Sequence, residues 1–498
     1  MFSRRLFSSY NPRCSCLPHR RSYATTLPPT IKQLLASPST KQQDGQAKPQ
    51  PQKVEVTGWV RSIRRHARIS FAMITDGSTE KNLQAVVDTK LTKGLTNGVS
   101  VRLTGTLSDS PGPGQDKELV VENVECLGEC DPEEYPIQKK ALTVDYLRDH
   151  CHLRTRTAEN ASMVRLRHTT LKSLQDYFDN EGFCYAHTPI TTANDCEGAG
   201  EAFLVTAPGI DEPASSTSSP APSHFFGRPA YLTVSSQLHL EALASSISRV
   251  YTISPAFRAE RSHTGRHLAE FWMLEAEWAF TRNVDDVCDV VEDSLKFALE
   301  KASENSKGDL NVLWGPDATE KLKILESAKD EAKKWTRMSY TEAVKELETF
   351  YAQAKNKPFE IEPKWGRSLG SEHERWIAEE LVDGPVFVKD YPETLKPFYM
   401  RANEDGNTVG CFDLLVPGLG ELVGGSVREE RYDVLKKKVE DAGLKLEDYD
   451  WYLDLRKYGG APHGGFGVGF ERLVKWMSGV ENIRECIPMP RWQGRMLL

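Results

Sequence analysis

The sequence of 498 residues has no run of apolar residues that approaches the length of a membrane span, so no membrane partner is expected. It also lacks an excess of positive charge. Its formal net charge of −8 argues against a protein that coats nucleic acid by charge alone, so RNA binding would need local basic patches. The length allows two or three domains with a sizeable core.

Acidic residues are absent from the first 26 positions, and the first carboxylate belongs to Asp44. The segment has no apolar centre of the secretory type, and it holds five arginines: Arg4, Arg5, Arg13, Arg20 and Arg21. This composition predicts a mitochondrial presequence over residues 1–26 and a protein of the mitochondrial matrix; a disordered basic tail is the alternative. Residues 27–52, rich in proline, glutamine, serine and lysine, are expected to form a linker.

The ten cysteines do not make a zinc-binding pattern. Cys126 and Cys130 form a pair, but no second pair completes a site, and Cys14 and Cys16 lie in the presequence. We therefore expect reduced thiols and no cysteine-bound metal cluster.

Five short stretches rich in β-branched residues lie between residues 53 and 128, which predicts a small barrel of the oligonucleotide-binding (OB) type. A basic loop is expected between the first two strands, with Arg61, Arg64, Arg65, His66 and Arg68. Phe71 and Gln84 lie on the following strands. Charges can hold phosphates, a ring can stack on a base and an amide can read a base edge, so these residues predict contact with single-stranded RNA. A stable barrel with a solvated basic loop is the alternative.

The rest of the chain alternates between helical and extended patterns. Residues 129–158 are expected to form a polar hinge with a short helix, and apolar residues at helical spacing then predict a helix to about residue 181. The stretch FCYAHTPITT predicts a strand interrupted by Pro189, which places it at an edge or an interface because proline lacks the N–H of a central ladder. Residues 211–223 predict a flexible insertion, and residues 284–380 predict mostly charged helices.

The stretch FRAERSHTGRHLAEF, residues 257–271, places three arginines and two histidines on a loop between two strands. Alternation along the outgoing strand predicts a core face with Trp272, Leu274, Trp278 and Phe280, and a cleft face with Phe271, Met273, Glu275 and Glu277. Arg258 and Glu260 share a face of the incoming strand. Such a hairpin suits a nucleotide, because arginine forks onto phosphate and an aromatic ring stacks on a base. A plain ion pair between Arg258 and Glu260 is the alternative.

Two common phosphate-binding loops are missing. The sequence has no Gly-x-x-x-x-Gly-Lys-Ser/Thr loop, and no Gly-x-Gly-x-x-Gly opens a helix after a strand. The hairpin instead resembles motif 2 of the class II aminoacyl-tRNA synthetases. GFGVGFERLV, residues 465–474, resembles motif 3, and EGFCYAHTPI, residues 181–190, resembles motif 1, whose proline lies at the dimer interface. The three stretches have the order and spacing of that family.

The barrel resembles the anticodon-binding domain of subclass IIb, which holds the aspartyl, asparaginyl and lysyl enzymes. DCEGAGEAF, TVSSQLHLEAL and YGGAPHGGFGVGFERLV are similar to stretches of the asparaginyl members, and the resemblance runs from about residue 53 to 498. It implies an α+β fold: an OB-type barrel of five strands at 53–128, a hinge at 129–158, and a class II catalytic domain at 159–498 with an antiparallel sheet flanked by helices.

The activity implied by this resemblance is the ATP-dependent ligation of L-asparagine to tRNA(Asn) through an asparaginyl-adenylate, by a homodimer serving mitochondrial translation. An aspartyl enzyme of the same subclass and an inactive RNA-binding paralogue are the alternatives. Arg258 is expected to bind the α-phosphate and the amino-acid carboxylate, and Arg472 the γ-phosphate; a surface pair of Glu471 with Arg472 is the alternative. The other expected ATP-binding residues are Glu260, Arg266, His267, Phe271 and Glu421.

Two further sets of residues follow from the resemblance. Asp413 and Glu421 are expected to bind Mg²⁺, which prefers hard oxygen ligands. The expected amino-acid site comprises Glu197, Gln237, Glu241, Glu275 and Arg428.

Asparagine is expected in preference to aspartate because of the residues that follow Gln237. In aspartyl enzymes a lysine stands three positions after this glutamine, whereas Leu240 stands there in this sequence. Glu241 is expected to accept a hydrogen bond from the side-chain amide and to repel aspartate, and Arg428 to donate to the amide oxygen. A carboxylate on the helix surface is the alternative for Glu241.

Overall fold

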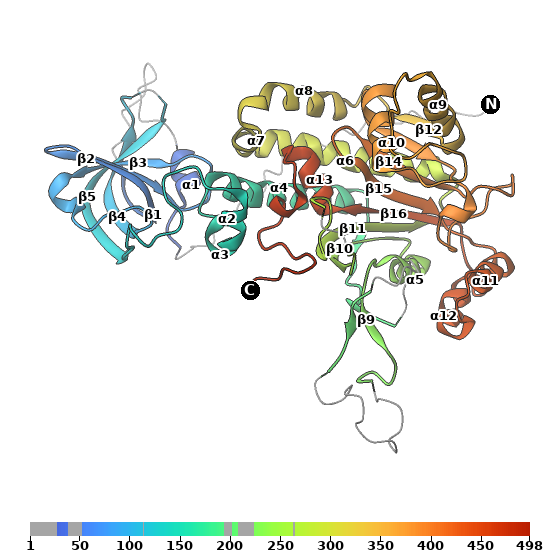
Figure 1. The fold of residues 1–498 in the computed structure, drawn as a ribbon. Coiled ribbons are helices and arrows are strands. Elements are labelled where there is room, and N and C mark those ends of the chain that lie inside the picture. The colour runs from blue at the N-terminus through green and yellow to red at the C-terminus, as the bar shows by residue number, and fades with distance from the viewer. Residues whose placement is uncertain (1–26, 38–51, 113, 194–201, 208–223, 262–263) are drawn as a thin grey trace, which may run out of the picture. The chain divides into compact units, whose positions relative to one another are not determined.

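A computed structural model describes the chain except for residues 1–26, 38–51, 113, 194–201, 208–223 and 262–263. The predicted presequence, the insertion at 211–223 and Glu197 therefore lie outside the described residues. The chain divides into two compact units, residues 1–135 and 136–498 (Figure 1).

The first unit contains the predicted OB-type barrel of five strands, closed in the order β1-β2-β3-β5-β4. The strands are β1 (Gln52–Arg65), β2 (Ile69–Thr75), β3 (Leu83–Asp88), β4 (Ser100–Asp109) and β5 (Lys117–Gly128). Every second residue of β4 from Val101 to Leu107 is buried, as expected for a barrel whose interior is filled by side chains.

The basic stretch before β2 is not the loop that the sequence predicts. β1 continues through Arg65, which pairs with Ser70 of β2. The loop is therefore only three residues long, 66–68, and most of the arginines project from a strand. The long, strongly paired β1–β2 ribbon explains the difference, since it closes with a tight turn.

The predicted linker is also wrong in part. It contains a short helix, α1 (Ile31–Leu35), which begins with a capping box formed by Thr30 and Gln33. Ile31 and Leu34 are buried in the barrel core. Burial of these two aliphatic side chains fixes a segment whose overall composition is polar.

The second unit is built on a sheet of eight strands in the order β12-β13-β14-β15-β16-β11-β10-β6. The strands are β6 (Cys184–Tyr185), β10 (Arg249–Phe257), β11 (Glu270–Ala279), β12 (Thr336–Ser339), β13 (Val386–Lys389), β14 (Cys411–Val416), β15 (Gly420–Val427) and β16 (His463–Gly469). All neighbours are antiparallel except the outermost pairs, β12 with β13 and β6 with β10. The predicted α+β class with a largely antiparallel sheet is confirmed.

Helices of the second unit flank this sheet and supply its cores, except α2 (Val144–Asp149) and α3 (Cys151–Arg154), which contribute to neither core. The others are α4 (Ala158–Asn180), α5 (Gln237–Ile247), α6 (Val284–Asn305), α7 (Lys307–Trp314), α8 (Ala318–Ala328), α9 (Tyr340–Gln353), α10 (Ser371–Trp376), α11 (Tyr432–Asp441), α12 (Leu446–Lys457) and α13 (Phe470–Ser478). One core joins α4 and α6 to the central strands, through Leu174, Leu295 and Leu274. A second core joins α9, α11 and α12. The helices α11 and α12 lie at the lower right of Figure 1. None of the described helices is both long enough and apolar enough to span a membrane.

The motif 1 segment is split between two sheets. β6 has only two residues and forms the edge of the large sheet, as the proline predicts. After Pro189 the chain enters a small sheet of three strands, β7 (Thr191–Thr192), β8 (Leu204–Val205) and β9 (Ala230–Leu232).

Burial along β11 does not alternate as predicted, because residues 274–278 are all buried, including Glu275 and Glu277 of the expected cleft face. Leu274 and Trp278 are buried, but Trp272 is 38% exposed and Phe280 is 76% exposed. Trp272 precedes Met273, where pairing with β16 begins. Phe280 lies beyond the end of β11 with a φ of 67°, so the strand period no longer applies to it.

Candidate active site

Two cavities adjoin at the β10–β11 hairpin and share lining residues. The hairpin cavity is lined by all seven predicted ATP-binding residues: Arg258, Glu260, Arg266, His267, Phe271, Glu421 and Arg472. The inner cavity is lined by residues that include Gln237, Leu240, Glu275, Arg428 and Asp413. Arg258 and Glu421 line both cavities, so this arginine lies where the two spaces meet.

The wall of the hairpin cavity is formed by side chains of β10, β11 and the loop between them. The guanidinium of Arg258 lies 5.6 Å from the centre of the Phe271 ring. Nε2 of His267 lies 3.2 Å from a carboxylate oxygen of Glu260. Glu260 therefore has a partner in the loop, and the wall presents a cation and an aromatic ring side by side.

Arg472 enters the hairpin cavity from the first turn of α13. Its Nη1 donates to the backbone oxygen of Glu421 at 3.1 Å and lies 3.4 Å from Oε2 of the same residue. The neighbouring Glu471 is not part of a surface pair, because it is 1% exposed and its Oε1 lies 2.8 Å from Nη1 of Arg167. Glu471 also accepts the backbone N–H of Trp272 at 2.9 Å, which fixes α13 to β11.

The two predicted metal ligands converge above Gly424 of β15. A Cβ at Gly424 would lie 3.6 Å from Oε1 of Glu421 and 3.8 Å from Oδ1 of Asp413. Burial alone raises the pKa of Glu421, but the nearby cations, chiefly Arg472 and Lys396, hold it below its usual value. Two carboxylates around one point, with one kept ionised, fit Mg²⁺.

Two charged residues of this region were missed by the sequence analysis. Nζ of Lys396 lies 2.8 and 2.7 Å from the two oxygens of Asp413. Oε2 of Glu374 accepts the backbone N–H of Glu421 at 3.2 Å and lies 4.0 Å from Arg266. Burial, followed by the charge of Glu421, raises the pKa of Glu374 to about 7. Both residues lie in ordinary charged stretches, so no local pattern marks them.

The inner cavity holds a buried ion pair at one end. Nη2 of Arg428 donates to Oε2 of Glu277 at 2.8 Å, and Nη1 donates to Oγ of Ser426 at 2.5 Å. A Cβ at Gly465 would collide with the Glu277 carboxylate, so the glycine in the motif 3 strand makes room for this pair. The guanidinium of Arg428 is thus fixed in orientation where it meets the cavity.

Glu275 of β11 also lines the inner cavity, and its carboxylate contacts the residues that precede α5. One of its oxygens accepts the hydroxyl of Ser235 at 2.5 Å, and the carboxylate also accepts the backbone N–H of Ser236 at 2.9 Å. Burial raises the pKa of Glu275, although these two donors oppose the shift. A cation placed in the cavity would favour its ionised form.

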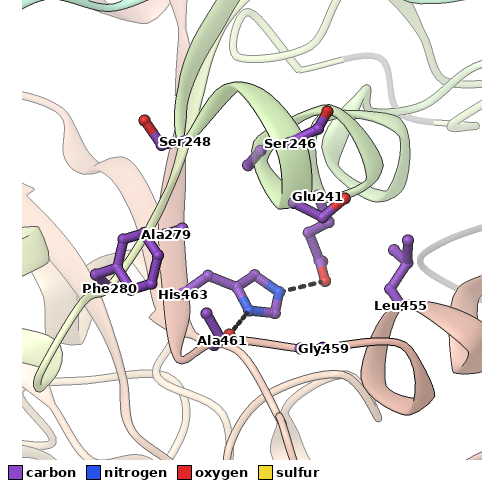
Figure 2. Close-up of a pocket in the computed structure, with 12 residues that line it drawn as sticks. Glu241, Ser246, Ser248, Ala279, Phe280, Leu455, Gly459, Ala461 and His463 are labelled. Atoms are coloured by element: carbon purple, nitrogen blue, oxygen red, sulfur yellow. Dashed lines mark hydrogen bonds and ion pairs between the residues drawn. The ribbon is translucent and has the colours of Figure 1, made fainter.

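The position of Glu241 differs from both expectations for it. It is 2% exposed, so it is not a surface carboxylate, and it is absent from the described residues that line the inner cavity. It lines a third cavity, shown in Figure 2, together with His463. Oε1 of Glu241 accepts from Nε2 of Gln237 at 3.2 Å, and its other oxygen also has protein partners. Gln237 and Glu241 are four residues apart on α5, so their side chains lie on the same face of the helix. The buried carboxylate of Glu241 is nevertheless directed towards interior cations such as Arg456.

The predicted RNA-binding residues lie on the outside of the barrel. Phe71 and Gln84 are half-buried on neighbouring strands, whereas Ala72 and Ala85 between them face the core. The Phe71 ring lies edge-on to His66, with centres 5.9 Å apart. Gln84 donates to a carboxylate oxygen at 3.3 Å.

Comparisons with known proteins agree with this geometry. Residues 143–493 match the family of class II tRNA synthetases (D, K and N), and residues 54–127 match the OB-fold nucleic acid binding domain. An asparagine–tRNA ligase of Desulfotalea psychrophila is 46% identical over 454 residues, which are 90% of this chain and 97% of that protein. An asparagine–tRNA ligase of Treponema denticola is 43% identical over 89% of this chain and 96% of its own length.

The fold is also similar to that of a solved structure. The asparaginyl-tRNA synthetase of Pyrococcus horikoshii, complexed with asparaginyl-adenylate, superposes with a TM-score of 0.80 at 29% identity. The match covers 95% of this chain and 100% of that one. Because the family match spans residues 143–493 and the relatives match along most of the sequence, the chain belongs to the class II tRNA synthetases of the D, K and N group.

Proposed function

We propose that the protein activates L-asparagine with ATP and transfers it to tRNA(Asn). The observation that carries this proposal is the place of Arg258 at the junction of the hairpin cavity and the inner cavity. One guanidinium there can contact the α-phosphate on one side and the amino-acid carboxylate on the other. The relatives named as asparagine–tRNA ligases support asparagine as the substrate.

ATP is assigned to the hairpin cavity. Phe271 would stack on adenine, with Glu260 near its exocyclic amine, and Arg472 would hold the γ-phosphate. Arg266 and His267 would follow the triphosphate along the loop. The cavity thus matches a bent nucleotide with a base at one end and charge at the other.

Mg²⁺ is assigned to Asp413 and Glu421. When bound there, it would supply positive charge beside the phosphates. Lys396 holds Asp413, and Glu374 accepts the backbone N–H of Glu421, so both carboxylates are positioned by other side chains.

The chemical step needs no general base, because the nucleophile is already a carboxylate. Its oxygen would attack the α-phosphorus, the bond from that phosphorus to the bridging oxygen would break, and pyrophosphate would leave. Arg258 would offset the charge that builds up on the α-phosphate oxygens. Positioning and charge stabilisation therefore supply the rate enhancement.

Asparagine is assigned to the inner cavity. Arg428 would donate to the side-chain amide oxygen, and Gln237 and Glu275 would hold the α-amino group. Leu240 lines the cavity where aspartyl enzymes carry a lysine, which removes a partner for a carboxylate side chain. This leucine argues against the aspartyl alternative.

The decisive experiment is ATP–pyrophosphate exchange with each amino acid supplied separately. Exchange with asparagine and not with aspartate is expected. Exchange with aspartate alone would reject the substrate and leave the ATP site standing, whereas no exchange with any amino acid would favour an inactive RNA-binding relative.

A homodimer is proposed from the edge position of β6, because motif 1 segments of this family pair across a two-fold axis. Light scattering at micromolar concentration tests it, and a monomeric mass would reject it. Function in the mitochondrial matrix is proposed from the arginine-rich, acid-free N-terminus. Fusing residues 1–50 to a fluorescent protein tests that proposal, with a diffuse cytosolic signal as the contrary outcome.

A further inference from the structure

The carboxylate of Glu241 lies at the centre of a buried hydrogen-bond network behind the inner cavity. Its Oε2 accepts from the hydroxyl of Tyr452 at 2.7 Å, from Nη2 of Arg456 at 2.7 Å and from Nε2 of His463 at 2.9 Å. Burial alone would raise the pKa of Glu241, but Arg456 and His463 hold it well below its usual range. The residue is therefore an ionised carboxylate whose Oε2 is held from outside the inner cavity, while its Oε1 lies 3.9 Å from Nε of Arg428.

His463 lies between two acceptors. Figure 2 shows its ring between Glu241 and Ala461, whose backbone oxygen lies 2.8 Å from Nδ1. A carboxylate oxygen only accepts, so Nε2 donates to Glu241 in this arrangement. The ring thus connects the carboxylate on α5 to the chain that leads into β16.

Arg456 connects this carboxylate to a second part of the inner cavity. Its Nη2 bonds to Glu241, and its Nε donates at 2.9 Å to the backbone oxygen of Glu429, the residue directly after Arg428. The guanidinium lies 4.1 Å from the centre of the Tyr452 ring, and the side chain is 1% exposed. One planar group thus holds both α5 and the chain that carries Arg428.

We propose that Arg456 is a positioning residue that determines selectivity for the amino acid. It holds Glu241, which in turn fixes the amide of Gln237, and it holds the backbone beside Arg428. α12 would then control amino-acid recognition without touching the substrate. This inference rests on the assignment of Gln237 and Arg428 to the asparagine site.

The first test is Arg456→Lys, which keeps the charge but replaces a planar fork by a single ammonium that cannot span both partners. Tyr452→Phe is the milder companion, because it removes one donor to Glu241 and leaves the ring in place. Arg431→Lys is the matched control. Arg431 pairs with the Glu429 side chain at 2.6 Å and is 44% exposed.

The readouts are the KM for asparagine, the KM for ATP and the ratio of asparagine to aspartate activation, all by pyrophosphate exchange, with Tm to verify folding. Arg456→Lys should raise the KM for asparagine about tenfold or more, with the KM for ATP within about twofold, and should lower the activation ratio. Tyr452→Phe should move the same quantities by less, and Arg431→Lys should leave them unchanged.

An unchanged KM for asparagine in folded Arg456→Lys and Tyr452→Phe would overturn the inference. A parallel rise of both KM values would also overturn it, because a general loss of structure would cause that result. If Arg456→Lys does not fold, Tyr452→Phe decides alone. Failure of the wild type to activate asparagine would reject the assigned substrate, which is a separate outcome.

Discussion

Nζ of Lys396 lies within 2.8 Å of both oxygens of Asp413, so a lysine neutralises one of the two carboxylates assigned to Mg²⁺. The other carboxylate, Glu421, has its own cation in Arg472. The two acids are thus separately paired in the protein without metal. Bound Mg²⁺ would bring further positive charge to these two carboxylates, in addition to that of Lys396 and Arg472.

Replacing Lys396 by methionine should therefore make the protein depend on Mg²⁺ for stability. Breaking a largely buried pair leaves Asp413 uncompensated and costs about 3–5 kcal/mol. Mg²⁺ should recover part of this loss, so the rise of Tm on adding the metal should exceed that of the wild type. Lys389→Met is the control, since Lys389 pairs with Asp285, which is 44% exposed. An equal metal effect in both variants and the wild type would contradict the metal assignment.

Arg258→Ala should abolish most activity without unfolding the protein. Removing a charge-assisted contact made in the transition state costs about 10²-fold or more in rate. The rate of pyrophosphate exchange measures this, with Tm as the check on folding. Arg249→Ala, at the first residue of the strand β10 that leads to Arg258, should keep normal exchange. Near wild-type exchange by folded Arg258→Ala would remove this residue from the mechanism.

Glu275 should make stability depend on pH. Burial raises its pKa above the usual 4.5, so its contribution to stability is fully present below pH 4.5 and is lost as pH rises through the folded-state pKa. Glu275→Gln removes this loss of stability with rising pH, because an amide does not ionise. The Tm of the variant minus that of the wild type should therefore become more positive between pH 4.5 and pH 8.

Glu342 supplies the control for this measurement. Hydrogen bonds from the backbone and side chain of Ser339 lower its pKa, so its contribution is lost only as pH falls below the usual value. Glu342→Gln should give a Tm difference that is constant from pH 5.5 to pH 8. A constant difference for Glu275→Gln as well would show that its carboxyl is not perturbed by burial.

Phe71→Ala should weaken tRNA use without affecting adenylate formation. Stacking of a base on an aromatic side chain is worth about 1–3 kcal/mol, so the KM for tRNA should rise about fivefold or more. Pyrophosphate exchange should not change, because the barrel is a separate compact unit. Val120→Ala, which also truncates an apolar side chain on the outside of the barrel, is the control. An unchanged KM for tRNA would reject the RNA contact of Phe71.

The sequence predicted the parts of the site that depend on local pattern. Arg258 and Phe271 belong to one hairpin, and Arg472 follows a glycine-rich strand, so alternation and motif order were sufficient to bring them together. Glu374, Lys396 and Arg456 were missed because each comes from a separate element, and their roles arise only through tertiary contacts. No periodicity within α10 or α12 distinguishes them from solvated charges.

Glu241 shows the limit of reasoning from spacing. It lies one turn after Gln237 on α5, and the two side chains bond at 3.2 Å. Whether Glu241 contacts the substrate depends on which element packs against α5. That element is α12, about 210 residues further along the chain, and its Tyr452 and Arg456 bond to Glu241. Long-range packing of this kind cannot be read from a local motif.

The residue at position 240 should set the preference between asparagine and aspartate. Leu240 is 1% exposed and lines the inner cavity, so a carboxylate ligand meets an aliphatic side chain at this point. Leu240→Lys would place a cation there, and a buried carboxylate needs such a partner. The ratio of aspartate to asparagine activation in pyrophosphate exchange should rise about tenfold or more, mainly through the KM for each amino acid. Leu240→Met is the control, because methionine is similar in length to lysine but carries no charge; this variant should keep the wild-type ratio. Equal ratios for the lysine and methionine variants would show that position 240 does not contact the side chain of the substrate, and the aspartyl alternative would then have to be judged on Arg428 alone.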